Sequence, residues 1–339
     1  MPLQLNRSRL VLSGSRGELA RIRREFERAD CIVLPNFLDA ALLSVLQQQV
    51  ASGLFSAQEH GGFGRDFPMS DNPASQVLNF LLNDPRLLNL VRDLTGCRAI
   101  RSFKGSVRRA IAGPGNSLSW HNDTVGGRLV ALTLNLGTEP YRGGFLQIRD
   151  HKSKRMIREV ANTRSGDAVV FRISKSLEHR NSRVLGKVAK TAFSGWFLES
   201  DGLVDTLEMS PAQLAAHSSN GARGLASFPA AERVKASTRL TIPADIVWRR
   251  IGDGMIVVKA IDGLCYRLDP VGRRIWELVA KRATPSTIVT RIANEYNAPR
   301  KTIERDVVAL LADLAANQLL TVEPPAASPP VRRVQHARA

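Results

Sequence analysis

The sequence has few cysteines, and they follow no pattern. Cys31, Cys97 and Cys265 are spread over 339 residues without a CxxC pair. An odd number of isolated cysteines argues against a disulfide framework and against a cysteine-based zinc site. We therefore expect three reduced thiols, most of them buried, and look for metal ligands among other residue types.

Long apolar runs are also missing. No run approaches the roughly 18 residues that a membrane-spanning helix needs, and the N-terminal segment MPLQLNRSRLVLSGSRGELARIRREF lacks the apolar core of a signal peptide. We expect a cytoplasmic protein that does not cross a membrane. The hydrophobic content of 43% is ordinary for a globular protein, and the length allows two domains, or one large domain with an appendage.

Acidic residues are in the minority, so the chain is basic, with a formal net charge of +17. Residues 1–235 carry +11 of this charge, residues 236–325 carry +3, and residues 326–339 carry +3. The excess could attract an acidic peptide or nucleic acid, but it fits equally well a soluble basic protein that uses arginine in place of lysine. The small charge of 236–325 argues against nucleic-acid binding there.

The first two thirds of the chain are predicted to be mostly β with flanking helices. Helices are expected at 17–29 and 39–53, around a strand that begins at Cys31. From 98 to 200, short β-type runs are separated by Gly, Pro and Asn. Several short strands at such spacing are typical of a β-sandwich or barrel.

After residue 239 the pattern changes. Three short strands, the last at 263–268, are followed by three amphipathic helices, the last at 300–317. The Pro-rich basic end is predicted to be disordered. The resulting division is a first domain at 1–205, a linker at 206–238, a second domain at 239–322 and a tail at 323–339.

The stretch SWHNDTVGGRLVALTLNLG, residues 119–137, places His121 and Asp123 just before an alternating run. The pair could be a turn with an Asp–His hydrogen bond or two ligands of a metal ion. His179, after a strand-like run and a loop, is the best candidate for a third ligand. Two histidines and one carboxylate form the facial triad of non-haem Fe(II) oxygenases. The remaining histidines lie in the linker, the tail or loops: His217, His336, His60 and His151.

A basic residue is expected near such a triad. A keto-acid co-substrate would point its second carboxylate into the protein, and an unpaired buried charge is costly. Lys190 in VAKTAFSGWF fits this role, and Arg183 is the alternative. A solvated lysine at a strand edge is the other interpretation. Side chains alternate along a strand, so three more residues are expected on the face of Lys190: Ala192, Ser194 and Trp196.

These residues lie within stretches that resemble a known family. SLSWHND, LVALTLNLG, YRGGFLQI and RSGDAVVFRISKSLEHRNSRVLGKVAKTAFSGWF resemble the Fe(II)/2-oxoglutarate-dependent dioxygenases of the prolyl-4-hydroxylase type, over about residues 20–200. The resemblance implies a double-stranded β-helix, the jelly-roll core. It carries His121, Asp123 and His179 to the catalytic, iron-binding positions, and Lys190 to the position that binds the 2-oxoglutarate carboxylate.

The same resemblance implies Fe(II), with 2-oxoglutarate and O2 as co-substrates and ascorbate as an accessory reductant. Oxidative decarboxylation of 2-oxoglutarate to succinate and CO2 would be coupled to hydroxylation of an unactivated C–H bond. The chain departs from the family in one respect, because SVRRAIAGPGNSLSW contains no tyrosine. The remaining contacts to 2-oxoglutarate are therefore left open.

The C-terminal stretches YRLDPVGRRIWELV, TIVTRIANEY and IERDVVALLADLAANQLL resemble the PqqD-like family over 239–322. The resemblance implies a small α+β, winged-helix-like domain that recognises precursor peptides. A leader peptide would add as a strand at 263–268 and lie against helix 300–317. Trp276 has helical spacing with its apolar neighbours, so we expect it in the core, and Asp306 is expected at the surface.

The sequence thus favours an Fe(II)- and 2-oxoglutarate-dependent hydroxylase of a ribosomally synthesised precursor peptide, in natural-product biosynthesis, with leader recognition in the same chain. The first alternative is an oxygenase of a free small molecule or amino acid, with the C-terminal domain as a protein–protein adaptor. The second, of a different class, is a non-catalytic nucleic-acid-binding protein. The complete set of His121, Asp123 and His179 argues against that loss of catalysis.

Overall fold

The computed structural model describes residues 3–60, 64–70, 73–161, 163–200 and 234–323. These residues form two compact units. The first contains the described residues up to 200 with 244–251 and 256–267, and the second contains 234–243, 252–255 and 268–323. Most of the predicted linker and nearly all of the predicted tail lie outside the described residues, so the proposed domain boundaries stay a prediction.

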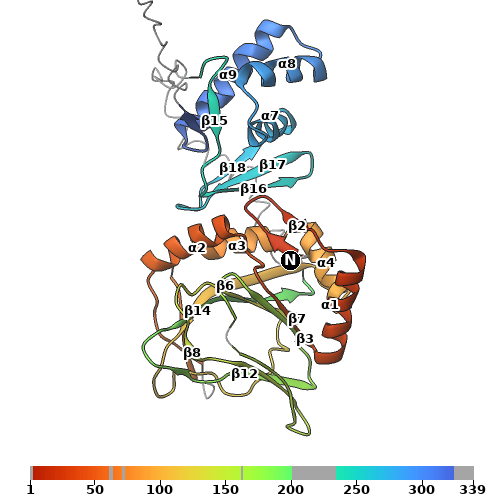
Figure 1. The fold of residues 1–339 in the computed structure, drawn as a ribbon, viewed down its shortest axis with the longest axis vertical. Coiled ribbons are helices and arrows are strands. Elements are labelled where there is room, and N and C mark those ends of the chain that lie inside the picture. The colour runs from red at the N-terminus through yellow and green to blue at the C-terminus, as the bar shows by residue number, and fades with distance from the viewer. Residues whose placement is uncertain (1–2, 61–63, 71–72, 162, 201–233, 324–339) are drawn as a thin grey trace, which may run out of the picture. The chain divides into compact units, whose positions relative to one another are not determined.

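A sheet of seven antiparallel strands is the framework of the first unit (Figure 1). Its strand order is β3 (Cys31–Leu34), β11 (Ala168–Arg172), β7 (Arg128–Asn135), β14 (Lys190–Leu198), β6 (Ser102–Ala110), β5 (Gly64–Pro68) and β4 (Gln58–His60). Strand β14 lies in the middle and pairs with both β6 and β7 over most of its length. This central position makes the alternation of its side chains decisive for the site.

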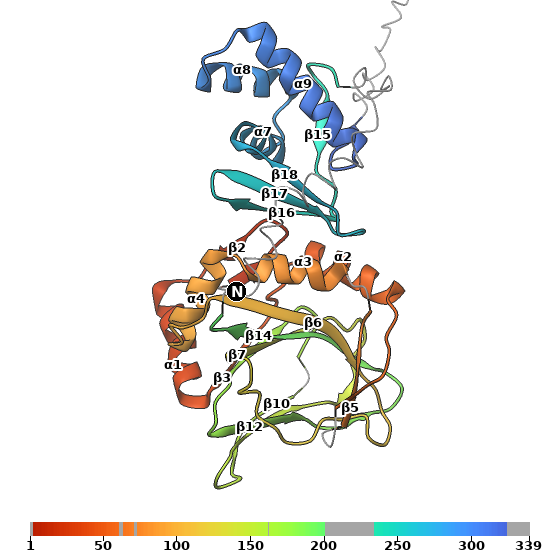
Figure 2. The same ribbon diagram turned by 180° about the vertical axis from the view of Figure 1, so that it is seen from behind.

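Four helices cover one face of this sheet (Figures 1 and 2). They are α1 (Arg16–Ala29), α2 (Ala40–Ser52), α3 (Pro73–Leu82) and α4 (Pro85–Thr95). Helix α1 begins at a capping box, in which Ser15 and Glu18 bond to each other's backbone N–H. The apolar faces of the helices pack on alternate residues of the strands, such as Leu132 of β7 and Phe193 of β14.

A smaller antiparallel sheet packs against the other face. It consists of β10 (Met156–Val160), β9 (Leu146–Asp150) and β12 (Leu177–Asn181), in that order. Ile148 and Leu177 from this sheet pack with Ala131 and Phe171 from the large one. Two facing sheets of this kind make the mostly β, jelly-roll architecture that the sequence predicts. Short strands complete the unit: β1 (Leu3–Leu5), β2 (Leu10–Leu12), β8 (Arg142–Gly143) and β13 (Val184–Leu185).

The C-terminal part contains the predicted three strands and three helices. Strands β16 (Ile246–Ile251), β17 (Gly254–Lys259) and β18 (Cys265–Leu268) form one sheet in that order, so β18 is an edge strand within the part of the chain that the structure describes. The helices are α7 (Pro270–Ala280), α8 (Pro285–Glu295) and α9 (Arg300–Ala316), and β15 (Arg239–Thr241) pairs with β19 (Thr321–Glu323). Trp276 is fully buried, which confirms its predicted place in the core.

Several features of the chain differ from the prediction or were missed by it. Helices α3 and α4 and strand β10 were not predicted, and His179 lies within β12 rather than after a loop. The thiol of Cys31 is buried, but Cys265 is exposed.

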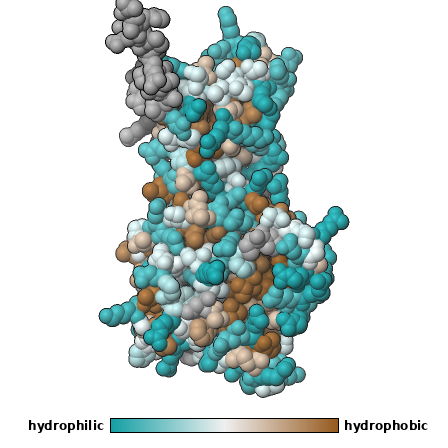
Figure 3. Space-filling model, viewed as in Figure 1, coloured by the Kyte–Doolittle hydropathy of each residue, from teal (hydrophilic) through white to brown (hydrophobic). Residues whose placement is uncertain are grey.

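Hydrophilic side chains cover much of the face in Figure 3, with hydrophobic ones in groups between them. Among the described residues, no helix combines the length and apolar character that crossing a membrane requires.

Candidate active site

Two neighbouring side chains, His121 and Asp123, meet the sequence-distant His179 between the two sheets. His121, Asp123 and His179 each offer one donor atom, and these atoms lie within 4.8 Å of one another. Nε2 of His179 is 3.4 Å from Oδ2 of Asp123, and Nε2 of His121 is 3.9 Å from Oδ1. Two imidazoles and a carboxylate at this spacing suit a metal such as Fe(II), which accepts mixed nitrogen and oxygen ligands.

The backbone holds the two imidazoles together. His121 lies outside the long strands, but its N–H donates to the carbonyl of His179 at 3.1 Å, and the N–H of His179 donates back at 2.8 Å. This reciprocal pair is an isolated antiparallel bridge, and it places the two rings 4.4 Å apart between centroids. The ring of His179 also packs edge-on against Phe171 of β11, at 4.9 Å. Both imidazoles are therefore oriented before any ligand binds.

The protonation states suit metal binding. Burial and the charge of His179 lower the pKa of His121, so its ring is neutral at neutral pH. Its Nδ1 lies 2.7 Å from the carbonyl oxygen of Ser119, which assigns the proton to Nδ1 and leaves Nε2 facing Asp123. Burial acts to raise the pKa of Asp123, but hydrogen bonding and charge from His179, His121 and Trp196 outweigh it and hold the pKa at about 2. The carboxyl is ionised.

Two residues from outside the triad hold Asp123. The indole Nε1–H of Trp196 donates to Oδ2 at 2.8 Å, and Nη1 of Arg128 donates to Oδ1 at 3.1 Å. The guanidinium of Arg128 lies over the Trp196 ring, 3.8 Å from its centroid, so the two residues support each other. Sequence reasoning missed Arg128. It placed Trp196 on the correct face of its strand but assigned no function to it. The register that puts Trp196 opposite Ala131 of β7 is what brings these groups together.

The predicted alternation along β14 is confirmed. Phe193 and Phe197 pack under the helices, whereas Trp196 packs with the apolar residues between the sheets. Ser194 lies on that inner face too, with its Oγ 3.4 Å from Oγ1 of Thr133. Lys190 begins the same series, so its side chain starts on the face that carries Trp196.

Lys190 is enclosed at the end of this face. Its ammonium donates to the carbonyl of Gly144 at 2.6 Å and to Oδ1 of Asn181 at 2.8 Å. Burial lowers its pKa to about 8. Both oxygens are neutral acceptors, and no carboxylate within the described ranges is paired with this ammonium. The side chain of Arg183, the alternative candidate, is on an exposed residue of the turn between β12 and β13.

Tyr141 is a second residue that sequence reasoning missed. It is buried, its ring centroid lies 5.8 Å from Nζ of Lys190, and burial raises its pKa to about 12. The motif YRGG, residues 141–144, which begins with Tyr141 and lies just before strand β9, was the available signal. No tyrosine occurs in the stretch 106–120 where one was sought.

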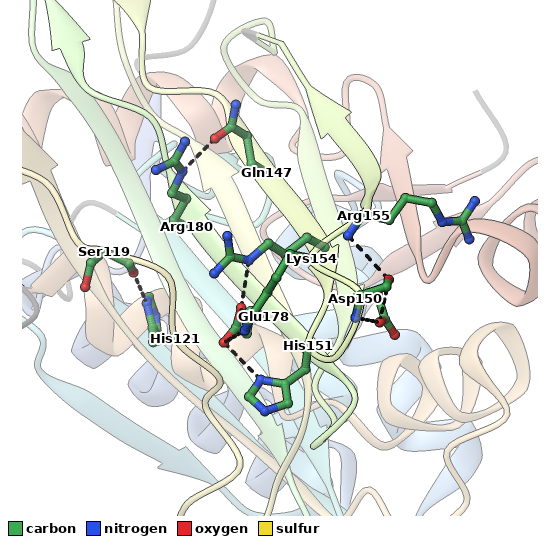
Figure 4. Close-up of polar contacts among 11 residues, drawn as sticks. Ser119, His121, Gln147, Asp150, His151, Lys154, Arg155, Glu178 and Arg180 are labelled. Carbon is green, nitrogen blue, oxygen red and sulfur yellow. Dashed lines mark hydrogen bonds and ion pairs between the residues drawn. The ribbon is translucent and has the colours of Figure 1, made fainter.

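A polar network lies on the outer face of the small sheet, next to the triad (Figure 4). Glu178 precedes His179, and its carboxylate accepts from Arg149 at 2.7 Å, His151 at 2.9 Å and Lys154 at 3.1 Å. Burial acts to raise the pKa of Glu178, but hydrogen bonds from the three bases outweigh it and hold the pKa at about 2. Arg180, two residues after Glu178 on β12, donates to Oε1 of Gln147 at 2.7 Å.

Comparison with known proteins agrees with both halves of this description. Residues 106–198 match the model of the 2OG-Fe(II) oxygenase superfamily, and residues 254–320 match that of coenzyme PQQ synthesis protein D (PqqD). A search of curated proteins gave no match.

Solved structures similar to parts of the chain include three of note. A 2OG-Fe(II) oxygenase-family oxidoreductase from Burkholderia pseudomallei is 16% identical, with 57% of this chain and 96% of that one covered and a TM-score of 0.43. A prolyl-4-hydroxylase from Pseudomonas putida is 16% identical, with 53% and 98% covered and a TM-score of 0.42. TbiB1, solved with the TbiA(beta) leader peptide, is 36% identical, with 24% and 93% covered and a TM-score of 0.23.

The family match over 106–198 spans the strands that carry the triad, and it defines the class of protein. The chain carries a 2OG-Fe(II) oxygenase domain, an enzyme domain that uses Fe(II), 2-oxoglutarate and O2. More particularly, this domain is joined in one chain to a PqqD-like segment.

Proposed function

We propose that this protein hydroxylates a ribosomally synthesised precursor peptide, whose leader is held by the PqqD-like domain while its core enters the oxygenase site. The observation that carries the proposal is the union, in one chain, of an oxygenase match containing His121, Asp123 and His179 with a PqqD match at 254–320.

The triad is the proposed iron site. His121 and His179 supply nitrogen donors, and Asp123 supplies an ionised oxygen donor whose charge offsets part of that of the metal. The contacts from Trp196 and Arg128 to Asp123 are the kind of outer support that fixes a ligand's orientation.

Lys190 is the proposed partner of the distal carboxylate of 2-oxoglutarate. Its side chain is half-buried and, among the described residues, its ammonium donates to two neutral oxygens, those of Gly144 and Asn181, so an incoming carboxylate would supply the missing negative charge. Ser194, which lies between Lys190 and Trp196 on β14, pairs with Thr133 on β7. The two residues add hydroxyl groups to the same inner face of the sheet.

When bound, iron with 2-oxoglutarate and O2 supplies the oxidising chemistry that converts a C–H bond into C–OH. The chain supplies the geometry. His121 and His179 are fixed by their backbone bridge, and Asp123 by its two outer donors. Lys190 orients the co-substrate from the far end, and the apolar residues between the sheets keep water away.

Leader recognition is proposed at β18 and α9. Strand β18 is an edge of its sheet within the described residues, and Cys265 and Arg267 on it are exposed, so a leader strand can add beside it. On α9, Ile303, Val307, Leu311 and Leu314 are buried, whereas Leu310 is half-buried at the margin of the apolar stripe. We propose that the three strands and three helices form a winged-helix-like unit. The 36% identity to TbiB1, which was solved with a leader peptide, supports the same role.

Tethering explains why one chain carries both parts. Once the leader is bound, the core peptide reaches the oxygenase site at an effective concentration set by the connecting chain. The oxygenase site then needs little affinity of its own for the modified residue.

The test uses the full-length enzyme with Fe(II), 2-oxoglutarate and a candidate precursor peptide that consists of a leader and a core. We expect mass spectrometry to show the gain of one oxygen atom in the core, and a large drop in rate when the leader is removed. Leu310→Asp should weaken leader binding by fluorescence anisotropy, and Ala309→Asp, on the neighbouring exposed position, should not. Equal turnover with and without the leader, or oxidation of a free amino acid only, would favour the small-molecule alternative.

A further inference from the structure

The reverse side of the metal site holds a stacked arrangement that the proposed chemistry does not use. The ring of Trp120 is stacked with two guanidinium groups, that of Arg149 at 4.0 Å and that of Arg180 at 4.5 Å from the ring centroid. One tryptophan therefore contacts cations from two neighbouring strands, β9 and β12.

Each of the two arginines is itself fixed. Nε of Arg149 donates to Glu178 at 2.7 Å, and Nε of Arg180 donates to Gln147 at 2.7 Å, which in turn donates to Glu159 at 2.6 Å. Figure 4 shows Arg180 bonded to Gln147, and Glu178 within its polar network. A guanidinium that is already hydrogen-bonded in one orientation is a more rigid stacking surface than a freely rotating one.

The strand register places this stack behind the ligands. On β12, Glu178 and Arg180 flank His179, and successive side chains of a strand point to opposite faces. His179 shares its face with Ile148, which is buried between the sheets, so Glu178 and Arg180 lie on the outer face. Trp120 contacts this outer face, and the next residue, His121, turns inward to His179.

We propose that Trp120 is a positioning residue of the metal site, which acts from the outer face of the small sheet to hold the segment bearing His121 against β12. His121 and His179 exchange two backbone hydrogen bonds as an isolated antiparallel bridge. Asp123, two residues further on, is tied to Trp196 and Arg128 on the large sheet. The stack adds an attachment of the same segment to β9 and β12 of the small sheet, next to the bridge. This inference rests on the proposed metal role of His121 and His179.

The test is a titration of the full-length, metal-free protein with Co(II) in the presence of 2-oxoglutarate, followed by calorimetry. Trp120→Leu should weaken Co(II) binding about ten- to a hundredfold, the usual effect of losing outer support of a ligand. Trp120→Phe, which keeps an aromatic face for the two arginines, should recover most of that loss. Arg180→Met should weaken binding in wild-type protein but have little further effect in Trp120→Leu, because both changes remove the same stack.

Val160→Ala is the matched control. Val160 is a buried residue of β10 in the same small sheet and does not contact the stack, so its substitution lowers the melting temperature without touching the ligands. The proposal is overturned if Trp120→Leu binds Co(II) like the wild type. It is also overturned if Val160→Ala weakens binding as much, since the effect would then be general destabilisation. Failure of the wild type itself to bind Co(II) would instead remove the proposed metal site.

Discussion

Trp196 donates its indole N–H to Asp123 across 73 residues of sequence, at 2.8 Å. The donor comes from the central strand of the large sheet, and the acceptor comes from the segment that follows His121. Because Arg128 stacks on the same indole and donates to the other carboxylate oxygen, the orientation of Asp123 is set by two groups at once.

Trp196→Phe should weaken metal binding about tenfold, because it removes the donor to Asp123 but keeps a ring under Arg128. Calorimetric titration with Co(II) and 2-oxoglutarate measures this. Trp248→Phe, a substitution of the same kind in strand β16, is the control and should leave the affinity unchanged. An unaltered affinity in Trp196→Phe would show that Arg128 alone orients the carboxylate.

His121→Ala and Asp123→Ala should each abolish succinate formation from 2-oxoglutarate while the fold survives. Both residues contribute to a cluster of polar groups between the sheets and little to the apolar core. Circular dichroism checks the fold, and succinate release checks the reaction. Full turnover by either variant in metal-stripped buffer would refute the triad.

Lys190→Ala should weaken the binding of 2-oxoglutarate by about 3 kcal/mol, which raises its dissociation constant roughly a hundredfold, because the distal carboxylate loses its charged partner. The affinity for Co(II) measured without 2-oxoglutarate should barely change. Arg183→Ala is the control, since Arg183 is exposed. If Arg183→Ala gives the defect and Lys190→Ala does not, the assignment of the co-substrate carboxylate is wrong.

The affinity for 2-oxoglutarate should fall as the pH rises above about 8. The pKa of Lys190 is about 8 in the protein without co-substrate, and pairing with a carboxylate raises it. Binding therefore takes up a proton above pH 8, so affinity is full below that pH and declines by about tenfold per pH unit above it. Equilibrium binding between pH 7 and 9.5 measures the decline. Lys190→Arg should abolish it, because arginine stays charged; a decline that persists in this variant would assign it to another group.

Gly195→Ala should destabilise the protein by about 2 kcal/mol, because the sheet has no room for the methyl group. A Cβ there would lie 2.3 Å from the carbonyl oxygen of Lys104 and 2.4 Å from Cα of Gly105, on the paired strand β6. Gly17→Ala is the control, since its Cβ would meet only Ser15 at 3.7 Å in the first turn of α1, and it should be neutral or stabilising. Thermal unfolding of the two variants compares them, and equal melting temperatures would contradict the packing argument.

Local patterns were enough for most elements and for the ligand set. The capped helices α1 and α2, the alternating strands β7 and β14, and the amphipathic helices α7 to α9 carry their signals within a few turns of chain. The HxD pair and the later His179 were recognisable because the chemistry of a triad needs those residue types. Helix α4 carries local signals of the same kind, a capping Asp84, Pro85 at its start and Gly96 at its end, so the sequence could have predicted it.

The sequence by itself determined which side chains share a face of a strand, since alternation with period two is a property of each strand alone. It therefore placed Lys190 and Trp196 together correctly. Only the tertiary structure decided what that face meets. The pairing of β14 with β7 brings Trp196 to Asp123, the bridge between His121 and His179 closes the triad, and the stack on Trp120 lies behind it. These are contacts between strands distant in sequence, and the register that creates them depends on how whole sheets pack, which no single segment encodes.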